Sequence, residues 1–180
     1  MKHFLALLLP IGLLISSCTQ EPPSAQVTYH TQTPPGEPSN LVFKYTHRGR
    51  VINLRQMPSI TLADLETYKP FLTKDGTYGA IFNCNRTGKL RLFHHTAEQQ
   101  GYYMVSIVNG NLSEPLKIDQ PVRDGKLIVW KGLSETDLLL LDVTLPREGE
   151  SDEEAKERGK NALKELKAMG YEPPQPEERE

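Results

Sequence analysis

The chain has 180 residues and a formal net charge of −2 at pH 7, and 37% of its residues are hydrophobic. This length and apolar content suit one globular domain with appended segments and exclude two large hydrophobic cores. A near-neutral chain has no general electrostatic attraction for nucleic acid or anionic membranes, although a local charged patch is compatible with these values. We therefore expect a single domain and no nucleic-acid partner.

The first 17 residues differ from the rest of the chain. Lys2 and His3 precede the apolar run Phe4–Ile15, which is too short to span a bilayer comfortably and is typical of a signal peptide. The run ends in Ile-Ser-Ser-Cys, which resembles the lipobox of bacterial lipoproteins, where the cysteine is lipidated and becomes the first residue of the mature chain. This resemblance implies a signal peptide over residues 1–17 and lipidation at Cys18.

A lipid anchor at Cys18 would place the protein at the cell envelope, facing the periplasm or the exterior. Each buried CH₂ contributes about 0.8 kcal/mol, so two or more acyl chains hold a protein to a bilayer. Thr19, rather than aspartate, follows the cysteine, which by resemblance to lipoprotein sorting signals favours the outer membrane where one exists. The alternative is an ordinary signal peptide with an incidental Cys18. With Cys18 acylated, Cys84 remains without a disulfide partner, and its strand-like surroundings favour a buried thiol.

Residues 18–40 predict the lipidated cysteine followed by a proline-rich tether. Prolines alternate with Ser, Thr, Gln and Gly, a composition that cannot build a core and favours extended or disordered chain. An alternative is that Val27–Thr31 adds an edge strand to the domain.

The domain is expected over residues 41–146 and opens with strands. Leu41–Thr46 and Arg50–Leu54 are rich in β-branched and aromatic residues and predict a hairpin. Pro58 breaks this pattern, and Thr61 is placed to cap a short helical turn.

Two turn signals predict further strands. Asp75-Gly76 follows the extended run Thr67–Thr73 and precedes the strand that carries Cys84. Asn109-Gly110 joins two apolar runs and accepts positive φ at both residues, as a two-residue type I′ hairpin requires. The uninterrupted apolar run at residues 127–130 then predicts a strand covered on both faces.

A short amphipathic helix is expected over residues 87–99, where apolar residues recur at helical spacing. The adjacent His94 and His95 would point about 100° apart on this helix, and no partner at i,i+4 completes a metal site. We therefore expect a surface histidine pair and no metal. The residues expected to face the core are Leu90, Phe93 and Ala97.

The end of the domain predicts a second helix. Ser134, with Asp137 three residues later, forms a capping signal before a leucine-rich run. A strand over Leu139–Leu145 remains an alternative, because four consecutive leucines have no period. Pro146 is expected to close the domain.

Residues 147–170 predict a charged helix that begins at a Ser151–Glu154 capping box. Its apolar stripe is thin, so we expect a solvated appendage rather than part of the core. Residues 171–180 contain three prolines and four glutamates and are expected to be disordered.

The order of turns, glycines and prolines from Asp64 to Gly132 resembles the first periplasmic domain of SecD and SecDF, accessory subunits of the bacterial protein-export translocon. The likeness covers residues 52–142 and implies an α+β, ferredoxin-like fold with helices on one face of a mainly antiparallel sheet. The numbers of predicted strands and short helices give the same class. Leu92 departs from the family, which usually has an aromatic residue there. The matching positions are Gly88, Thr96, Gly101, Asn109, Gly110, Pro115, Pro121, Gly125 and Gly132.

This resemblance implies a binding module rather than an export motor. SecD proteins couple proton flow to export through several membrane spans, whereas this chain has no apolar run of about 20 residues after its signal peptide. We expect the domain to bind a protein or peptide, with an exported chain as one candidate partner, through a sheet edge or an apolar groove. Tyr102 and Tyr103 are candidate contacts.

Catalysis is not expected, and neither is a cofactor. No G-x-S-x-G motif, metal-ligand spacing or phosphate-binding loop organises the available side chains. Asp124 precedes Gly125 and is a turn residue by type. The alternatives to a binding module are a structural or stress-related envelope lipoprotein without a dedicated ligand, and a small hydrolase. The side chains available to a hydrolase would be Ser106, Ser113, His94, His95, Asp119 and Asp124.

Overall fold

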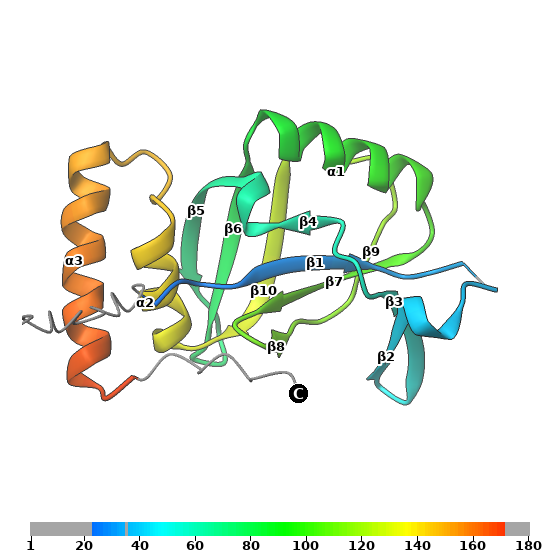
Figure 1. Ribbon diagram of the computed structural model, residues 1–180, viewed down its shortest axis with the longest axis horizontal. Coiled ribbons are helices and arrows are strands. Elements are labelled where there is room, and N and C mark those ends of the chain that lie inside the picture. The colour runs from blue at the N-terminus through cyan, green and yellow to red at the C-terminus, as the bar shows by residue number, and fades with distance from the viewer. Residues whose placement is uncertain (1–22, 35, 172–180) are drawn as a thin grey trace, which may run out of the picture.

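The computed structural model describes residues 23–34 and 36–171, which form an α+β fold (Figure 1). The strands are β1 Val27–Thr31, β2 Val42–His47, β3 Arg50–Arg55, β4 Ile60–Thr61, β5 Leu65–Leu72, β6 Tyr78–Cys84, β7 Tyr103–Val108, β8 Asn111–Leu112, β9 Leu116–Lys117 and β10 Lys126–Leu133. The helices are α1 Arg86–Glu98, α2 Glu135–Thr144 and α3 Asp152–Ala168, with short 3₁₀ turns at Ser39–Leu41 and Leu62–Asp64. None of the helices in these residues is both long and apolar enough to cross a membrane.

The strands divide among three antiparallel groups. A five-stranded sheet has the order β4-β1-β7-β8, with β9 also paired to β7; a three-stranded sheet has the order β10-β6-β5; and β2 pairs with β3. The α+β class and the antiparallel pairing are confirmed. The sheet is divided rather than continuous because β10, which follows the β7–β8 hairpin, returns to pair with β6.

β1 is an interior strand of the five-stranded sheet. It lies between β4 and β7, and its Val27 and Tyr29 side chains are buried. The predicted tether over residues 18–40 is therefore wrong for this segment, and the domain begins well before residue 41. The edge-strand alternative identified the right residues but not their central place. Flanking prolines dominated the composition, whereas Val27–Thr31 itself is rich in β-branched and aromatic residues.

The predicted type I′ turn at Asn109-Gly110 is confirmed, with φ of 49° and 84°. The predicted hairpin over residues 41–54 also forms and turns at Arg48-Gly49, with φ of 49° and 77°. A turn also forms at Asp75-Gly76, but only Gly76 has positive φ there. The strand over residues 127–130 also forms, but it is not covered on both faces, because Trp130 is 55% exposed.

α1 packs through a face that the apolar period did not identify. The buried residues are Gly88, Leu92 and Thr96, whereas Leu90 is 61% exposed. Gly88 lies against the 3₁₀ turn, where an added Cβ would come within 2.2 Å of the Asp64 carbonyl oxygen. The Thr96 hydroxyl donates to the Leu92 carbonyl at 2.7 Å, so a polar residue is satisfied within the interface. Glycine, and a threonine whose hydroxyl is hydrogen-bonded within the helix, do not appear in a hydrophobic pattern, so the buried face was predicted wrongly.

The core lies where the two larger sheets face one another. In Figure 1, β6 and β10 run across the direction of β1 and β7, and β5 lies beside β6. The Tyr29 ring meets Phe82 edge-on at 6.5 Å between centroids, and Tyr68 stacks on Phe82 at 6.1 Å. The buried leucines of α2, Leu138–Leu141, join the same cluster. α2 begins at the predicted Ser134 capping box, which excludes the alternative strand.

α3 is part of the domain rather than a solvated appendage. It packs along α2 and buries Ala162 and Leu166. The backbone N–H of Tyr171 donates to the Leu166 carbonyl at 3.0 Å, and the Tyr171 side chain is half-buried against the core. The domain therefore continues beyond Pro146. The rest of the predicted disordered tail, residues 172–180, lies outside the described residues.

Replacing Leu166 with alanine should lower the free energy of unfolding by about 2–4 kcal/mol, because a fully packed leucine is lost from the α2–α3 interface. Leu166 is 1% exposed, whereas the nearby Met169 is 57% exposed. Met169→Ala is therefore the control, with an expected change within about 0.5 kcal/mol. Urea unfolding measures both, and equal effects would contradict the packing of α3.

Candidate binding surfaces

The structure does not assemble the side chains considered for hydrolysis. The Ser106 and Ser113 hydroxyls hydrogen-bond to one another on the β7–β8 hairpin. Asp119 is exposed and pairs with Lys117 at 3.7 Å. Asp124 accepts a hydrogen bond from the Lys126 backbone N–H at 3.1 Å, as its turn position predicts. Within residues 23–34 and 36–171, no group of three or more His, Cys, Asp or Glu side chains is arranged to hold a metal ion.

The thiol and the histidine pair sit in separate environments. Cys84 is buried, and burial raises the pKa of its thiol to about 11, so the thiol is protonated and a poor nucleophile at neutral pH. His94 is exposed on α1 and His95 is half-buried. Burial lowers the pKa of His95 and favours its neutral imidazole.

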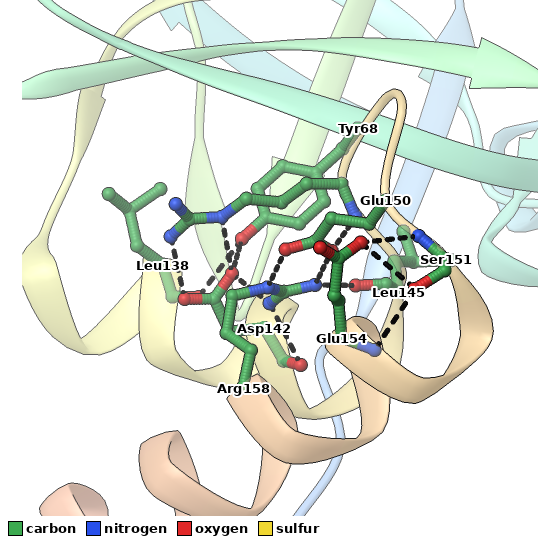
Figure 2. Close-up of polar contacts among 9 residues, drawn as sticks. Tyr68, Leu138, Asp142, Leu145, Glu150, Ser151, Glu154 and Arg158 are labelled. Carbon is green, nitrogen blue, oxygen red and sulfur yellow. Dashed lines mark hydrogen bonds and ion pairs between the residues drawn. The ribbon is translucent and has the colours of Figure 1, made fainter.

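A polar cluster joins β5, α2, the following loop and α3 (Figure 2). We call it the Asp142 cluster. Arg147 donates to both Asp142 carboxylate oxygens at 2.9 and 2.8 Å, and Tyr68 and Arg158 also donate to this carboxylate. Arg158 then donates to both oxygens of Glu150 at 2.7 Å. The central carboxylate is therefore neutralised and hydrogen-bonded by three donors although it is nearly buried.

The protonation states in the Asp142 cluster suit a cluster that stabilises the fold. Burial, and then the adjacent Asp142, raise the pKa of Tyr68 well above its ordinary value, so the phenol remains protonated. Arg158 lowers the pKa of Glu150 from 4.5 to about 2, which keeps that carboxylate charged. A hollow of about 510 Å³ opens beside the cluster, but its Arg147 and Arg158 guanidinium groups are already paired. The sequence contains no spacing that unites these residues, and the cluster was not predicted.

The outer face of the three-stranded sheet carries an uncovered apolar stripe. Because side chains alternate along strands, residues paired across β5, β6 and β10 share a face. Ile81 lies opposite Ile128 on one side and Lys69 on the other, which places it away from the core residues Ala80 and Phe82. We call this stripe the Trp130 face. Its apolar residues are Phe71, Ile81, Ile128 and Trp130.

Gly79 shapes one end of the Trp130 face. It pairs with Phe71, and an added Cβ would lie 2.3 Å from the Phe71 ring and 2.6 Å from the Trp130 carbonyl oxygen. The missing side chain therefore lets Phe71 lie across the sheet towards β10. At the other end, Glu148 contacts Lys69 and Lys126 at 4.0 and 3.8 Å. The apolar stripe consequently has a charged border.

β10 forms an open edge beside this face. It pairs with β6 along one side, and no backbone hydrogen bond from the described residues pairs its other side. The pairing is irregular between Val129 and Leu133, and Lys131 is exposed within this interval. A bulge and a lysine are features that restrain edge-to-edge aggregation. The edge therefore leaves backbone groups that a peptide can pair with before the bulge, while the bulge and Lys131 oppose pairing beyond Val129.

A second surface lies along the β2–β3 hairpin and includes the turn at its tip. We call this hairpin, Val42–Arg55, the arm, and the two adjoining hollows of about 620 and 290 Å³ the arm groove. Tyr103 lines the larger hollow and Tyr102 the smaller, while Gln32 and Val51 line both. Both tyrosines named from the sequence are thus half-buried in a groove, although the sequence did not identify its other walls.

No protein-family model and no curated protein matches the chain. Two solved structures are similar in fold. A crystal structure of SecDF in a super-membrane-facing form is 16% identical, with a TM-score of 0.45, and the match covers 77% of this chain and 18% of that one. A structure of SecDF, a membrane component that enhances protein export, is 16% identical with a TM-score of 0.46, and the match covers 79% of this chain and 63% of that one. At this identity and coverage, nothing about function follows from the likeness.

Acid should weaken the Asp142 cluster through Glu150. A carboxylate whose pKa is lowered on folding stabilises the protein above its unfolded pKa, and this stability is lost as pH falls towards the folded value. We expect Glu150→Gln to lower the free energy of unfolding by about 1–3 kcal/mol at pH 7, because one partner of the Arg158 pair is lost. The difference from wild type should shrink between pH 4.5 and about 2. Glu157→Gln, on the exposed side of α3, is the control for urea titrations, and a pH-independent difference would contradict the pairing.

Proposed function

We propose that this protein is a cell-envelope lipoprotein whose domain binds an extended segment of another protein, without catalysing a reaction. The observation that carries this proposal is the open edge of β10 beside the Trp130 face. An extended peptide can add to a sheet edge through main-chain hydrogen bonds, while alternate side chains contact the exposed sheet surface. Ile128 and Trp130 are two residues apart on β10 and offer such contacts.

The exposure of Trp130 favours binding over a purely structural role. Tryptophan has a large apolar surface and contributes strongly to protein interfaces. Trp130 is 55% exposed, next to half-buried Phe71 and Ile128. A purely structural role does not require this apolar face, whereas a strand added beside β10 would place its side chains against Ile128 and Trp130.

Lipidation at Cys18 supplies the proposed location, and Cys18 lies outside the described residues. The fold sets how far such an anchor can lie from the domain. Ala25 is 1% exposed, and its backbone N–H donates to Thr144 Oγ1 at 2.8 Å. Six residues separate Cys18 from Ala25. Seven Cα steps span at most roughly 25 Å, so the anchored domain would stay close to the bilayer surface.

An exported chain is the first partner to test. The sequence resemblance to SecD directs attention to export, and SecDF itself is described as enhancing that process. The physical support is separate: a chain in transit is unfolded and offers the extended backbone that an open edge requires. We propose that β10 engages such segments.

Peptide addition at β10 should change the emission of Trp130, which is the single tryptophan of the chain. An extended peptide with alternating apolar residues should shift the emission to shorter wavelength and saturate. The same peptide with alternate backbone nitrogens methylated should bind at least about tenfold more weakly, because it cannot donate to the edge. Ile128→Lys should weaken binding similarly. Leu90→Lys is the control, since Leu90 is exposed on α1. Equal binding of both peptides would refute strand addition.

Cells provide the corresponding test of the partner. A photo-crosslinking amino acid in place of Trp130 should capture exported or envelope proteins, and the same group in place of Leu90 should capture far less. Equal capture from both positions, or none from either, would contradict binding at β10 and favour a structural lipoprotein without a ligand.

Cys18→Ser should release the protein from membranes, because the acylated thiol would be lost while the folded domain is unchanged. Membrane fractionation and mass spectrometry of the mature N-terminus measure the outcome. Cys84→Ser is the matched control and should remain in the membrane fraction, since Cys84 is a buried core thiol. A serine variant that still sediments with membranes, together with an unmodified wild-type cysteine, would refute the anchor.

A further inference from the structure

The arm concentrates positive charge in a chain that is negative overall. Residues 42–55 contain no carboxylate, whereas the whole chain has a formal net charge of −2. The arm lies at the opposite end of the molecule from α2 and α3 (Figure 1). This is a local basic patch of the kind that the overall charge could not reveal. Its cations are Lys44, Arg48, Arg50 and Arg55.

The charged side chains of the arm line a hollow rather than a flat surface. Arg48 and Arg50 line the larger hollow of the arm groove, together with His47, Gln32 and Tyr103. Its volume of about 620 Å³ falls within the range of ligand-binding clefts. No carboxylate lines it. The hollow therefore combines cations with hydrogen-bonding side chains and an aromatic wall.

Arg48 and Arg50 are poorly compensated within the protein, whereas Arg55 pairs with Glu37 at 3.2 Å. Arg50 has no ion pair among the described residues. Arg48 contacts Glu114 at 3.4 Å, but the two side chains are 77% and 39% exposed, so the pair contributes little. Glu114 also contacts Lys131 at 3.5 Å and would keep a partner if Arg48 turned away. An incoming carboxylate could thus take Arg48 at small energetic cost.

The backbone of Arg48 adds a second observation. Its φ is 49°, a left-handed conformation that Asn and Gly adopt more readily than a long side chain. An Asn-Gly pair would form the same type I′ turn with less strain. The weak contact with Glu114 does not explain an arginine here, whereas a ligand for its guanidinium group does.

We propose that the larger hollow of the arm groove binds an acidic, extended protein segment, whose carboxylates pair with Arg48 and Arg50; the smaller hollow is lined by Glu37 and lies outside this site. Arginine binds carboxylates, like phosphates, through two parallel hydrogen bonds, so an acidic segment fits these side chains. A bilayer presents a broad surface and cannot enter a hollow, so the concave placement favours a peptide over anionic lipid. This site is distinct from β10 and does not depend on peptide addition there.

Fluorescence anisotropy with a labelled, glutamate-rich peptide tests the site. Arg48→Asn/Arg50→Ala should weaken binding at least about tenfold. The Asn-Gly turn created by the first change suits type I′ geometry, so the arm should stay folded. Lys74→Asn/Arg86→Ala removes the same charge from exposed positions outside the arm and should leave binding near wild type. The corresponding glutamine-rich peptide should not bind, and affinity for the glutamate peptide should fall between about 50 and 300 mM salt.

Several results would overturn the proposal. Equal loss in both double variants would show a general charge effect, and equal binding of the glutamine peptide would remove the role of carboxylates. Sedimentation with phosphatidylglycerol vesicles that depends on Arg48 and Arg50, without peptide binding, would assign the arm to lipid. Ile128→Lys separates this site from β10, since it should retain the glutamate peptide. Unchanged Trp130 emission and urea midpoints would confirm that the variants remain folded.

Discussion

The aromatic contact between the two larger sheets is the interaction on which the remaining structure depends. Tyr29 of β1 meets Phe82 of β6, and Tyr68 of β5 stacks on the same ring. Because these residues fix one face of the three-stranded sheet to the core, alternation forces Ile81 and Ile128 onto the other face. The Trp130 face is thus a consequence of core packing. Trp130 is the exposed residue of this face, and Ile81 and Ile128 are half-buried.

Turns were predictable from sequence because their chemistry is local. Asn109-Gly110 needs positive φ at two adjacent residues, and the residue types alone satisfy it. The same locality explains the success at Ser134, whose cap involves Asp137 three residues away. The prediction for β1 was wrong because the position of β1 between β4 and β7 depends on strands far along the chain. The residue types of β1 favour a strand, but the prolines on either side led to the prediction of an extended tether.

The candidate sites were less predictable than the fold, for the same reason. Asp142 gathers Tyr68 and Arg158 from 74 and 16 residues away, and no motif marks that convergence. The buried face of α1 contains Gly88 and Thr96, which no apolar period selects. Both are among the positions that match SecD, but the match did not assign them to the buried face. Of the binding surfaces, sequence named the groove tyrosines but not the β10 edge, which is defined by the lack of a neighbouring strand.

The two proposed binding surfaces lie on one domain, and this limits how they act. Each offers only a few contacts to an extended segment, so each should bind weakly by itself. If one unfolded chain reaches both β10 and the arm groove, the second contact becomes intramolecular, and its effective concentration can reach the millimolar range for a short connecting segment. A short connection between Cys18 and Ala25 would add a further constraint, because the domain could not move far from the bilayer. In Figure 1, β1 enters beside α2, and the arm lies at the other end. Anchoring at Cys18 would therefore hold the α2 end near the membrane and leave the basic arm free to reach outward.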